Sequence, residues 1–336
     1  MLAPRALDPL DQLQEEHGEA LSLAHLVEAK LDRLPLPGAG DTLARWRVLA
    51  AVAAHDLSLV KLFEGHTDAL AIQAELGAPA PPRGTRWGTW CAEPPDARVT
   101  LAADGAPPSV RLSGTKAWCS GAASLTHAVV SCWNAEGEPC LAAVALGQQG
   151  VTVTAEGWQA VGMAASGSVD VRLREAHAVQ LGAPGDYVRR AGFWHGGAGI
   201  AACWWGGAFG IARMVRAMSG PKPDPHRLAH LGAIDVALTA SAALLRESAA
   251  WIDSRPRADA RAVALRARLA VEQAAGEVML HAGRALGAAA LCRNARFARA
   301  MADLPVFLRQ SHAERDLAAL GDCLVEPVEG VPSWPL

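Results

Sequence analysis

The feature that most constrains the fold is a double change in hydrophobic period along the 336 residues. Apolar side chains recur at helical spacing over residues 1–83, then at a spacing of two over 84–182, and at helical spacing again over 183–336. "GAPAPPRG" (77–84) marks the first change. We therefore predict an α+β multidomain chain: an N-terminal helical domain (1–83), a middle β domain (84–182) and a C-terminal antiparallel helical bundle (183–336).

The middle segment consists of short β-rich runs separated by turns. The runs are "ARVTLAA", "SVRLSG", "HAVVSCW", "CLAAVALG", "GVTVTAE" and "GSVDVRLRE". Regularly spaced short strands of this kind indicate a small antiparallel barrel or sandwich. The last segment reads as long helices joined by short Pro-containing loops, with breaks at Pro256 and Pro305, which favours a bundle. No GxGxxG after a strand and no GxxxxGK occurs, so the common nucleotide-binding loops are absent.

Composition narrows the possible partners and compartment. The formal net charge of -3 gives no basic field for nucleic acid, so no nucleic-acid partner is expected. The seven cysteines form no CxxC pair, which fits reduced thiols in the cytoplasm better than disulfides or a zinc site; we expect no metal. Acids near the N-terminus occupy the place of a signal peptide's apolar core. The uncharged stretch 191–212 has the length of a membrane span, but its glycines and His195 favour a helix buried in a soluble bundle.

Several motifs together resemble the acyl-CoA dehydrogenase family of flavoproteins. "LSGTKAWCSGA" (112–122) is similar to the family's G-x-K-x-W/F-I-T/S hairpin, and "WCAEPPDARVTL" (90–101) lies where the family has its Thr-Glu-Pro loop. "LFEGHTDALAIQAELG" (62–77) looks like its Gly-His helix. "LHAGRALG" followed by "RFAR" resembles the late bundle with its Arg-x-x-Arg pair, Arg296 and Arg299.

The resemblance implies an FAD-dependent oxidoreductase and places residues around the cofactor. Trp118 would lie against the flavin ring and Ser120 would hydrogen-bond its edge, with Cys119 between them; Cys91 and Ala92 would face the flavin. An aromatic face can stack on an isoalloxazine, and a hydroxyl can tune its electron affinity. The other interpretation is that Trp118 is only a core side chain of a barrel.

The sequence also departs from the family pattern at its catalytic and cofactor-binding positions. The loop after Glu93 and Pro94 is shortened, and the turn between the first two bundle helices offers only Lys222 or Arg227 for the family's cofactor-binding Arg. Leu308 stands where the family has its catalytic glutamate. A leucine cannot remove the α proton of a thioester. Ile200 occupies the alternative position on the first bundle helix.

Three other side chains are candidates for the missing base: His195, His312 and Glu314. A histidine can accept a proton near neutral pH. However, His195 beside glycines is also typical of a core histidine, and "HAERDLAALG" is typical of an amphipathic surface helix. Glu93 is a further candidate, although its proline neighbour indicates a structural turn.

Three functions are compatible with this pattern. The first is an acyl-CoA dehydrogenase-like oxidoreductase acting on an acyl thioester such as acyl-CoA, or on a similar small apolar substrate. The second is a flavin-dependent monooxygenase of the same fold, using reduced flavin and oxygen. The third is a cofactor-free member acting as a subunit or scaffold. The resemblance also implies a homodimer or homotetramer formed through the bundle, with no membrane partner.

Overall fold

The structure, a computed structural model, describes residues 8–325. The N-terminal helices are α1 (Asp8–His17), α2 (Leu23–Glu28), α3 (Thr42–His55) and α4 (Leu57–Glu75). α1 ends directly before Gly18, which adopts a left-handed φ of 51° and separates it from α2. Asp56 begins α4 by accepting a hydrogen bond from the Leu59 amide at 2.6 Å.

The middle segment is a seven-stranded sheet that closes on itself. Its strands are β1 (Trp87–Trp90), β2 (Val99–Ala103), β3 (Ser109–Cys119), β4 (His127–Trp133), β5 (Pro139–Ala145), β6 (Val151–Val153) and β7 (Val169–Leu181). The pairing order β4-β2-β3-β7-β5 returns to β4, so five strands form a barrel. All six predicted runs are strands. The seventh, β1, was not predicted and pairs in parallel with β4.

The C-terminal segment is helical, as expected. It contains α5 (Asp186–Arg189), α6 (Gly192–Met218), α7 (Pro225–Ser254), α8 (Arg261–Arg293), α9 (Ala295–Phe307) and α10 (Glu314–Val325). The predicted break at Pro305 is wrong, because α9 continues through this proline and ends at Phe307. The helix–strand–helix content of the sequence prediction is confirmed.

The helices α6 and α7 both have apolar surfaces, but they differ in how much of that surface is buried. α6 contains most of the uncharged stretch and is largely buried within the bundle, as predicted. α7 is long and apolar enough to cross a membrane by length and composition, with only 22% of its most apolar window buried. Such a helix is weak evidence for a span, since helices of soluble bundles pass the same test.

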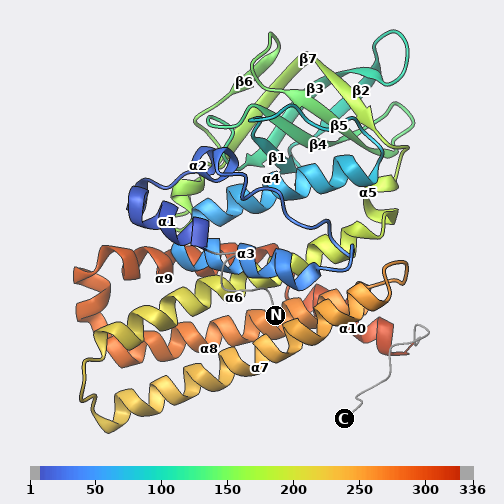
Figure 1. Cartoon of the computed structure of the whole chain (residues 1–336). Coiled ribbons are helices and arrows are strands. Elements are labelled where there is room, and N and C mark those ends of the chain that lie inside the picture. Colours follow the sequence, from blue (N-terminus) through green and yellow to red (C-terminus); the bar gives the residue numbers. More distant parts are fainter. Residues whose placement is uncertain (1–7, 326–336) are drawn as a thin grey trace.

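Helix α4 lies between the barrel and the bundle (Figure 1). The barrel sits on one side of it, and α3 and α6 lie on the other, with α7 and α8 farther away. Polar contacts fix α4 to β1: Thr89 Oγ1 donates to the Gly65 carbonyl at 2.7 Å, and the Trp87 amide donates to His66 Nδ1 at 3.1 Å. These contacts hold α4 in place at the junction of the barrel and the bundle.

Candidate functional site

A cavity of about 630 Å³ lies where α4, the ends of β1 and β3, and the helices α5, α6, α9 and α10 come together. We call it the barrel–bundle cavity. Its aromatic lining is Trp118, Trp158, Tyr187, Phe193, Trp194 and Phe307. Its charged lining is Lys61, Glu64, Asp68, Arg190, Arg268, Arg309, His312 and Asp316. The volume is in the range of small-molecule and cofactor sites.

Trp118 faces this cavity because β3 is irregular at its end. The pairing of β3 with β7 shifts register between Lys116 and Cys119, and Trp118 takes a left-handed φ of 56°. A bulge of this kind redirects a side chain out of the strand's alternation. Ala117 and Cys119 are consequently buried, while Trp118 is 50% exposed and is not a core side chain.

Ser120 belongs to a chain of hydroxyl groups along the same cavity. Its Oγ lies 2.8 Å from Ser168 Oγ, which lies 2.8 Å from Ser166 Oγ. Ser166 donates to the carbonyl of Met163 at 2.7 Å. These four residues all line the cavity. Because Ser166 donates to the Met163 carbonyl, Ser168 donates to Ser166 and Ser120 donates to Ser168, which leaves the Ser120 oxygen able to accept a hydrogen bond from a ligand.

Cys91 and Ala92 also line the cavity, directly after β1. Burial raises the pKa of the Cys91 thiol to about 11, so it is neutral at physiological pH. The next residue, Glu93, fixes this loop: its carboxylate accepts hydrogen bonds from Lys116 Nζ at 2.6 Å and Trp133 Nε1 at 3.0 Å. The structure thus places Glu93 in a structural contact rather than among the cavity's lining residues.

Three of the predicted site residues lie outside the cavity. The Cys119 side chain is buried and donates to the Lys116 carbonyl at 3.1 Å. His195 points to the turn at Gly38, where an added Cβ would lie 2.4 Å from its Nδ1, and burial lowers its pKa. Glu314 is exposed at the start of α10. Its neighbour His312 does line the cavity, with its Nδ1 3.4 Å from Asp316 Oδ1.

The two positions at which the acyl-CoA dehydrogenase pattern expects a base carry no acid here. Leu308 is 3% exposed and lies outside the cavity lining. Ile200 lines the cavity and offers only an aliphatic surface. Neither position can remove a proton, so the family's usual α,β-dehydrogenation has no base at its usual places.

Two of the three acids that line the cavity, Glu64 and Asp68, come from α4, the third being Asp316 on α10, and sequence reasoning missed them. Lys61, Glu64 and Asp68 follow at helical spacing on the cavity side. Burial acts to lower the pKa of Lys61, but the nearby charge of Glu64 outweighs it and the pKa is raised. The available signal was three charges spaced i, i+3 and i+7 in a helix whose other acid or base of fixed charge, Glu75, lies at its last residue.

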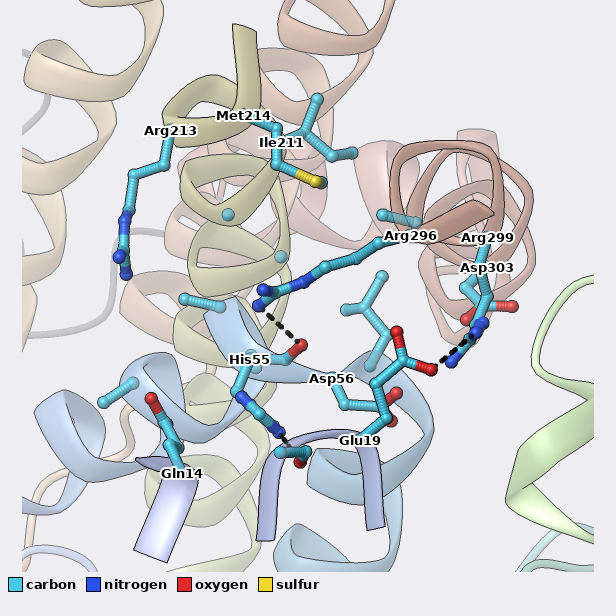
Figure 2. A pocket seen from close by; sticks show the side chains of 18 of the residues that line it. Gln14, Glu19, His55, Asp56, Ile211, Arg213, Met214, Arg296, Arg299 and Asp303 are labelled. Carbon is cyan, nitrogen blue, oxygen red and sulfur yellow. Dashed lines mark hydrogen bonds and ion pairs between the residues drawn. The ribbon is translucent and has the colours of Figure 1, made fainter. Parts of the chain in front are cut away.

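A second cavity of about 450 Å³ lies between α1, α3, α6 and α9. Figure 2 shows Arg296 pointing across it toward the His55 carbonyl, 3.4 Å away, and Arg299 paired with Glu19 at 3.3 Å. The Arg-x-x-Arg pair thus lines this cavity, not the barrel–bundle cavity. None of the predicted flavin-contacting residues lies here, so the barrel–bundle cavity is the candidate site.

Comparisons with known proteins agree on the fold. No protein-family model and no curated protein matches the sequence. Among solved structures, TdsC from Paenibacillus sp. A11-2, with FMN and indole, has a TM-score of 0.83 at 18% identity over 98% of this chain and 99% of that one. Methanesulfinate monooxygenase MsuC from Pseudomonas fluorescens has a TM-score of 0.78 at 21% identity, over 99% of both chains.

A third similar structure is a nitrososynthase from Micromonospora carbonacea var. africana, with a TM-score of 0.75 at 19% identity over 98% of both chains. The match along almost the whole length shows that this chain has the fold of these proteins. This is the acyl-CoA dehydrogenase-like fold that the motifs of the sequence predict.

Proposed function

We propose that the protein is a flavin-dependent monooxygenase that uses reduced FMN and dioxygen. The observation that carries the proposal is the composition of the barrel–bundle cavity: it keeps Trp118 and Ser120, yet Leu308 and Ile200 leave no base at the dehydrogenase positions. The similarity to TdsC, whose structure contains FMN, supports this choice over acyl-CoA dehydrogenation. The monooxygenase alternative thereby becomes the leading one.

The residues present fit a flavin. Trp118 offers a half-exposed indole face for the ring system, and Ser120 offers a hydroxyl held by Ser168. Cys91 and Ala92 bring backbone to the same cavity on the loop that Glu93 and Lys116 fix. When bound and reduced, the flavin would supply the electrons that activate dioxygen.

FMN fits the bundle better than the FAD that the sequence predicts. FAD carries a pyrophosphate that needs a cation from the turn between α6 and α7. Arg227 in this region donates to the carbonyls of Ala285 at 3.1 Å and Met218 at 3.4 Å, so its guanidinium is held within its own chain. Lys222 is exposed in the same turn and remains the alternative cation for FAD.

The chain's own contribution to the reaction is to bind the substrate and exclude water. Phe193, Trp194 and Phe307 supply an apolar wall to the cavity that Cys91 also lines. Such a wall orients an apolar substrate and limits unproductive loss of reducing equivalents to solvent. Ser120 would present its Oγ to the flavin as a hydrogen-bond acceptor, because its own proton is directed to Ser168 Oγ.

The test has a binding part and a chemical part. Titration with FMN and with FAD should quench tryptophan fluorescence, with tighter binding of FMN and weakened binding in Trp118→Ala. The FMN-loaded protein, supplied with reduced FMN and isotopically labelled dioxygen, should then place one labelled oxygen atom in a member of a panel of sulfides, indoles and amines. Absence of flavin binding would overturn the proposal and favour the cofactor-free function.

Acyl-CoA dehydrogenation makes the opposite prediction and is tested anaerobically. Acyl-CoAs of several chain lengths, mixed with the flavin-loaded protein without oxygen, should leave the flavin absorbance unchanged. Bleaching at any chain length would restore the dehydrogenase hypothesis, and one of the α4 carboxylates would then be the base to examine. Glu64 and Asp68 are the acids in reach of the same cavity on that helix.

We further propose a homo-oligomer formed through the bundle. α7 and α8 carry exposed apolar side chains, Leu228, Val236, Leu280 and Leu291. Burying such side chains between two copies is favourable by the hydrophobic effect. Light scattering after size exclusion should give a dimer or tetramer, and Val236→Glu should shift it toward the monomer.

A further inference from the structure

Two carboxylates lie on the side of α4 that faces the cavity, and only one of them has an ion-pair partner. Glu64 pairs with Lys61, with Oε2 2.9 Å from Nζ. Asp68, one helical turn later, makes no hydrogen bond or ion pair with any side chain or amide in the described residues 8–325. Acids in protein interiors are normally paired or hydrogen-bonded. Asp68 is therefore a partly buried acid that has no partner within residues 8–325.

The cations whose charges act on Asp68 make contacts with other groups, although the buried Nε of Arg190 has no partner. Arg190 pairs with Glu75, 2.8 Å away, and Arg45 donates to Thr67 Oγ1 at 3.1 Å and to the Pro35 carbonyl at 3.3 Å. Their charges, with that of Lys61, still act on Asp68 from a distance. Burial first, and then the negative charge of Glu64, nevertheless raise the pKa of Asp68. A cation arriving in the cavity would relieve both effects.

The other residues that line the cavity determine which kind of molecule could carry such a positive charge. Trp118, Trp158, Trp194 and Phe307 line the same space. Aromatic faces accommodate an apolar body and also attract an ammonium group over the ring. A free metal ion would find few ligands, because within residues 8–325 no three His, Cys, Asp or Glu side chains gather to hold one.

From this juxtaposition we infer that Asp68, flanked by Glu64, binds a protonated amine of the substrate. This inference rests on the proposed function, since it names the substrate class of the same cavity. The substrate is an amine with an apolar or aromatic body, oriented by its ammonium group at α4. Asp68 is a specificity-determining residue: it selects amines over neutral and anionic molecules of the same shape.

Three probes of one shape test the selection: phenethylamine, phenethyl alcohol and phenylacetate, titrated by calorimetry into the FMN-loaded protein. We expect phenethylamine to bind at least about tenfold more tightly than phenethyl alcohol, the size of one charge-assisted hydrogen bond. Phenylacetate should bind most weakly. If phenethylamine binds no more tightly than phenethyl alcohol, or does not bind the protein, the inference is wrong.

Two variants assign the effect to the residue. Asp68→Asn keeps the shape and removes the charge, so it should abolish most of the amine advantage while phenethyl alcohol affinity stays within about twofold. Glu314→Gln is the matched control, because it removes an exposed acid outside the cavity. Asp68→Ala serves as the second variant and should give the same loss. Unchanged amine selectivity in both Asp68 variants overturns the inference.

The same experiment separates this inference from the proposed function. FMN binding is measured first, by tryptophan quenching, in each protein. Amine selectivity that depends on Asp68 in a protein that binds no flavin would support the inference and refute the flavin proposal. Flavin binding without amine selectivity would support the flavin proposal and refute the inference that Asp68 binds an amine.

Discussion

Two clusters of buried charge, one in the barrel and one on α4, differ in how completely they are paired. In the barrel, Lys116 is fully buried and its ammonium has three partners: Glu93 Oε1 at 2.6 Å, Ser131 Oγ at 2.6 Å and the Ser131 carbonyl at 3.2 Å. On α4, Asp68 has no such partner within residues 8–325, and it is only partly buried at the cavity wall. The first cluster is closed and the second is open to the cavity.

The difference teaches how to separate structure from function in a buried charge. A buried ion whose hydrogen-bonding capacity is satisfied by the chain fixes a conformation, here the loop of Cys91 and Ala92. A charge left unsatisfied costs folding free energy, and such a cost is typical of sites that wait for a ligand. Substitutions should therefore have opposite effects on stability in the two clusters.

The largest expected effect is that of Lys116→Met. Removing the ammonium leaves Glu93 and Ser131 with unsatisfied groups, and the loss of one partner of a buried pair costs about 3 kcal/mol of unfolding free energy. Urea unfolding followed by circular dichroism measures it. Lys222→Met, at an exposed lysine, is the control and should change stability little. Equal unfolding midpoints for Lys116→Met and Lys222→Met would show that Lys116 and its partners do not stabilise the fold.

Trp118→Ala should affect a ligand far more than the fold. The indole is half exposed, so its removal should change the midpoint of unfolding only slightly. Loss of its stacking surface should weaken FMN binding about tenfold or more. Trp205→Ala is the control for a tryptophan outside the cavity; its Nε1 donates to the Leu238 carbonyl at 3.1 Å. Trp205→Ala should lose stability but retain FMN affinity. If Trp205→Ala weakened FMN binding and Trp118→Ala did not, the flavin would bind elsewhere.

Asp68→Asn should increase stability, in contrast to Lys116→Met. It removes a partly buried charge that has no partner within residues 8–325, and the expected gain is about 1 kcal/mol at neutral pH. The measurement is the same urea unfolding experiment, with Glu314→Gln as the exposed control. A loss of stability would mean that Asp68 makes a stabilising contact and would remove the basis of the comparison.

The sequence predicted the parts of the site that are local in the chain. Trp118 and Ser120 lie two residues apart in one hairpin, and Cys91 and Ala92 are adjacent, so a motif was enough to find them. Asp68 needed three elements from distant parts of the chain: α4, β1 and α6. Its spacing from Lys61 and Glu64 reads equally well as a solvated helix face. Only the packing of α4 between barrel and bundle makes that face internal.

The misplaced residues follow the same logic. Cys119 was assigned to the cofactor with its neighbours, but the register shift in β3 turns Trp118 out and leaves Cys119 in the core. His195 lies in a helix whose next residues, Gly196 and Gly197, do line the cavity. The side a helical residue presents depends on how its helix is rotated against its neighbours, and α6 directs His195 to Gly38. The fold class was easier to predict, because periodicity is averaged over many residues.

The smallest expected effect, and the sharpest test of the comparison, is the pH dependence of stability. Burial and Glu64 raise the pKa of Asp68 above 3.8, so its carboxyl destabilises the folded state as pH rises through the raised pKa. Burial acts to raise the pKa of Glu93 too, but hydrogen bonds from Lys116, Ser131 and Trp133 outweigh it and hold the pKa below 4.5. Its contribution to stability is present above pH 4.5 and is lost as pH falls.

The stability gain of Asp68→Asn should therefore grow as pH rises above 3.8, because the raised pKa makes ionisation of the carboxyl in the folded state unfavourable. The stability loss of Glu93→Gln should instead shrink as pH falls below 4.5, where the wild-type carboxyl also becomes neutral. Unfolding midpoints of both variants and the wild type across this range give the two curves. Parallel curves would mean that the α4 acid is paired after all, and the distinction between a closed and an open cluster would fail.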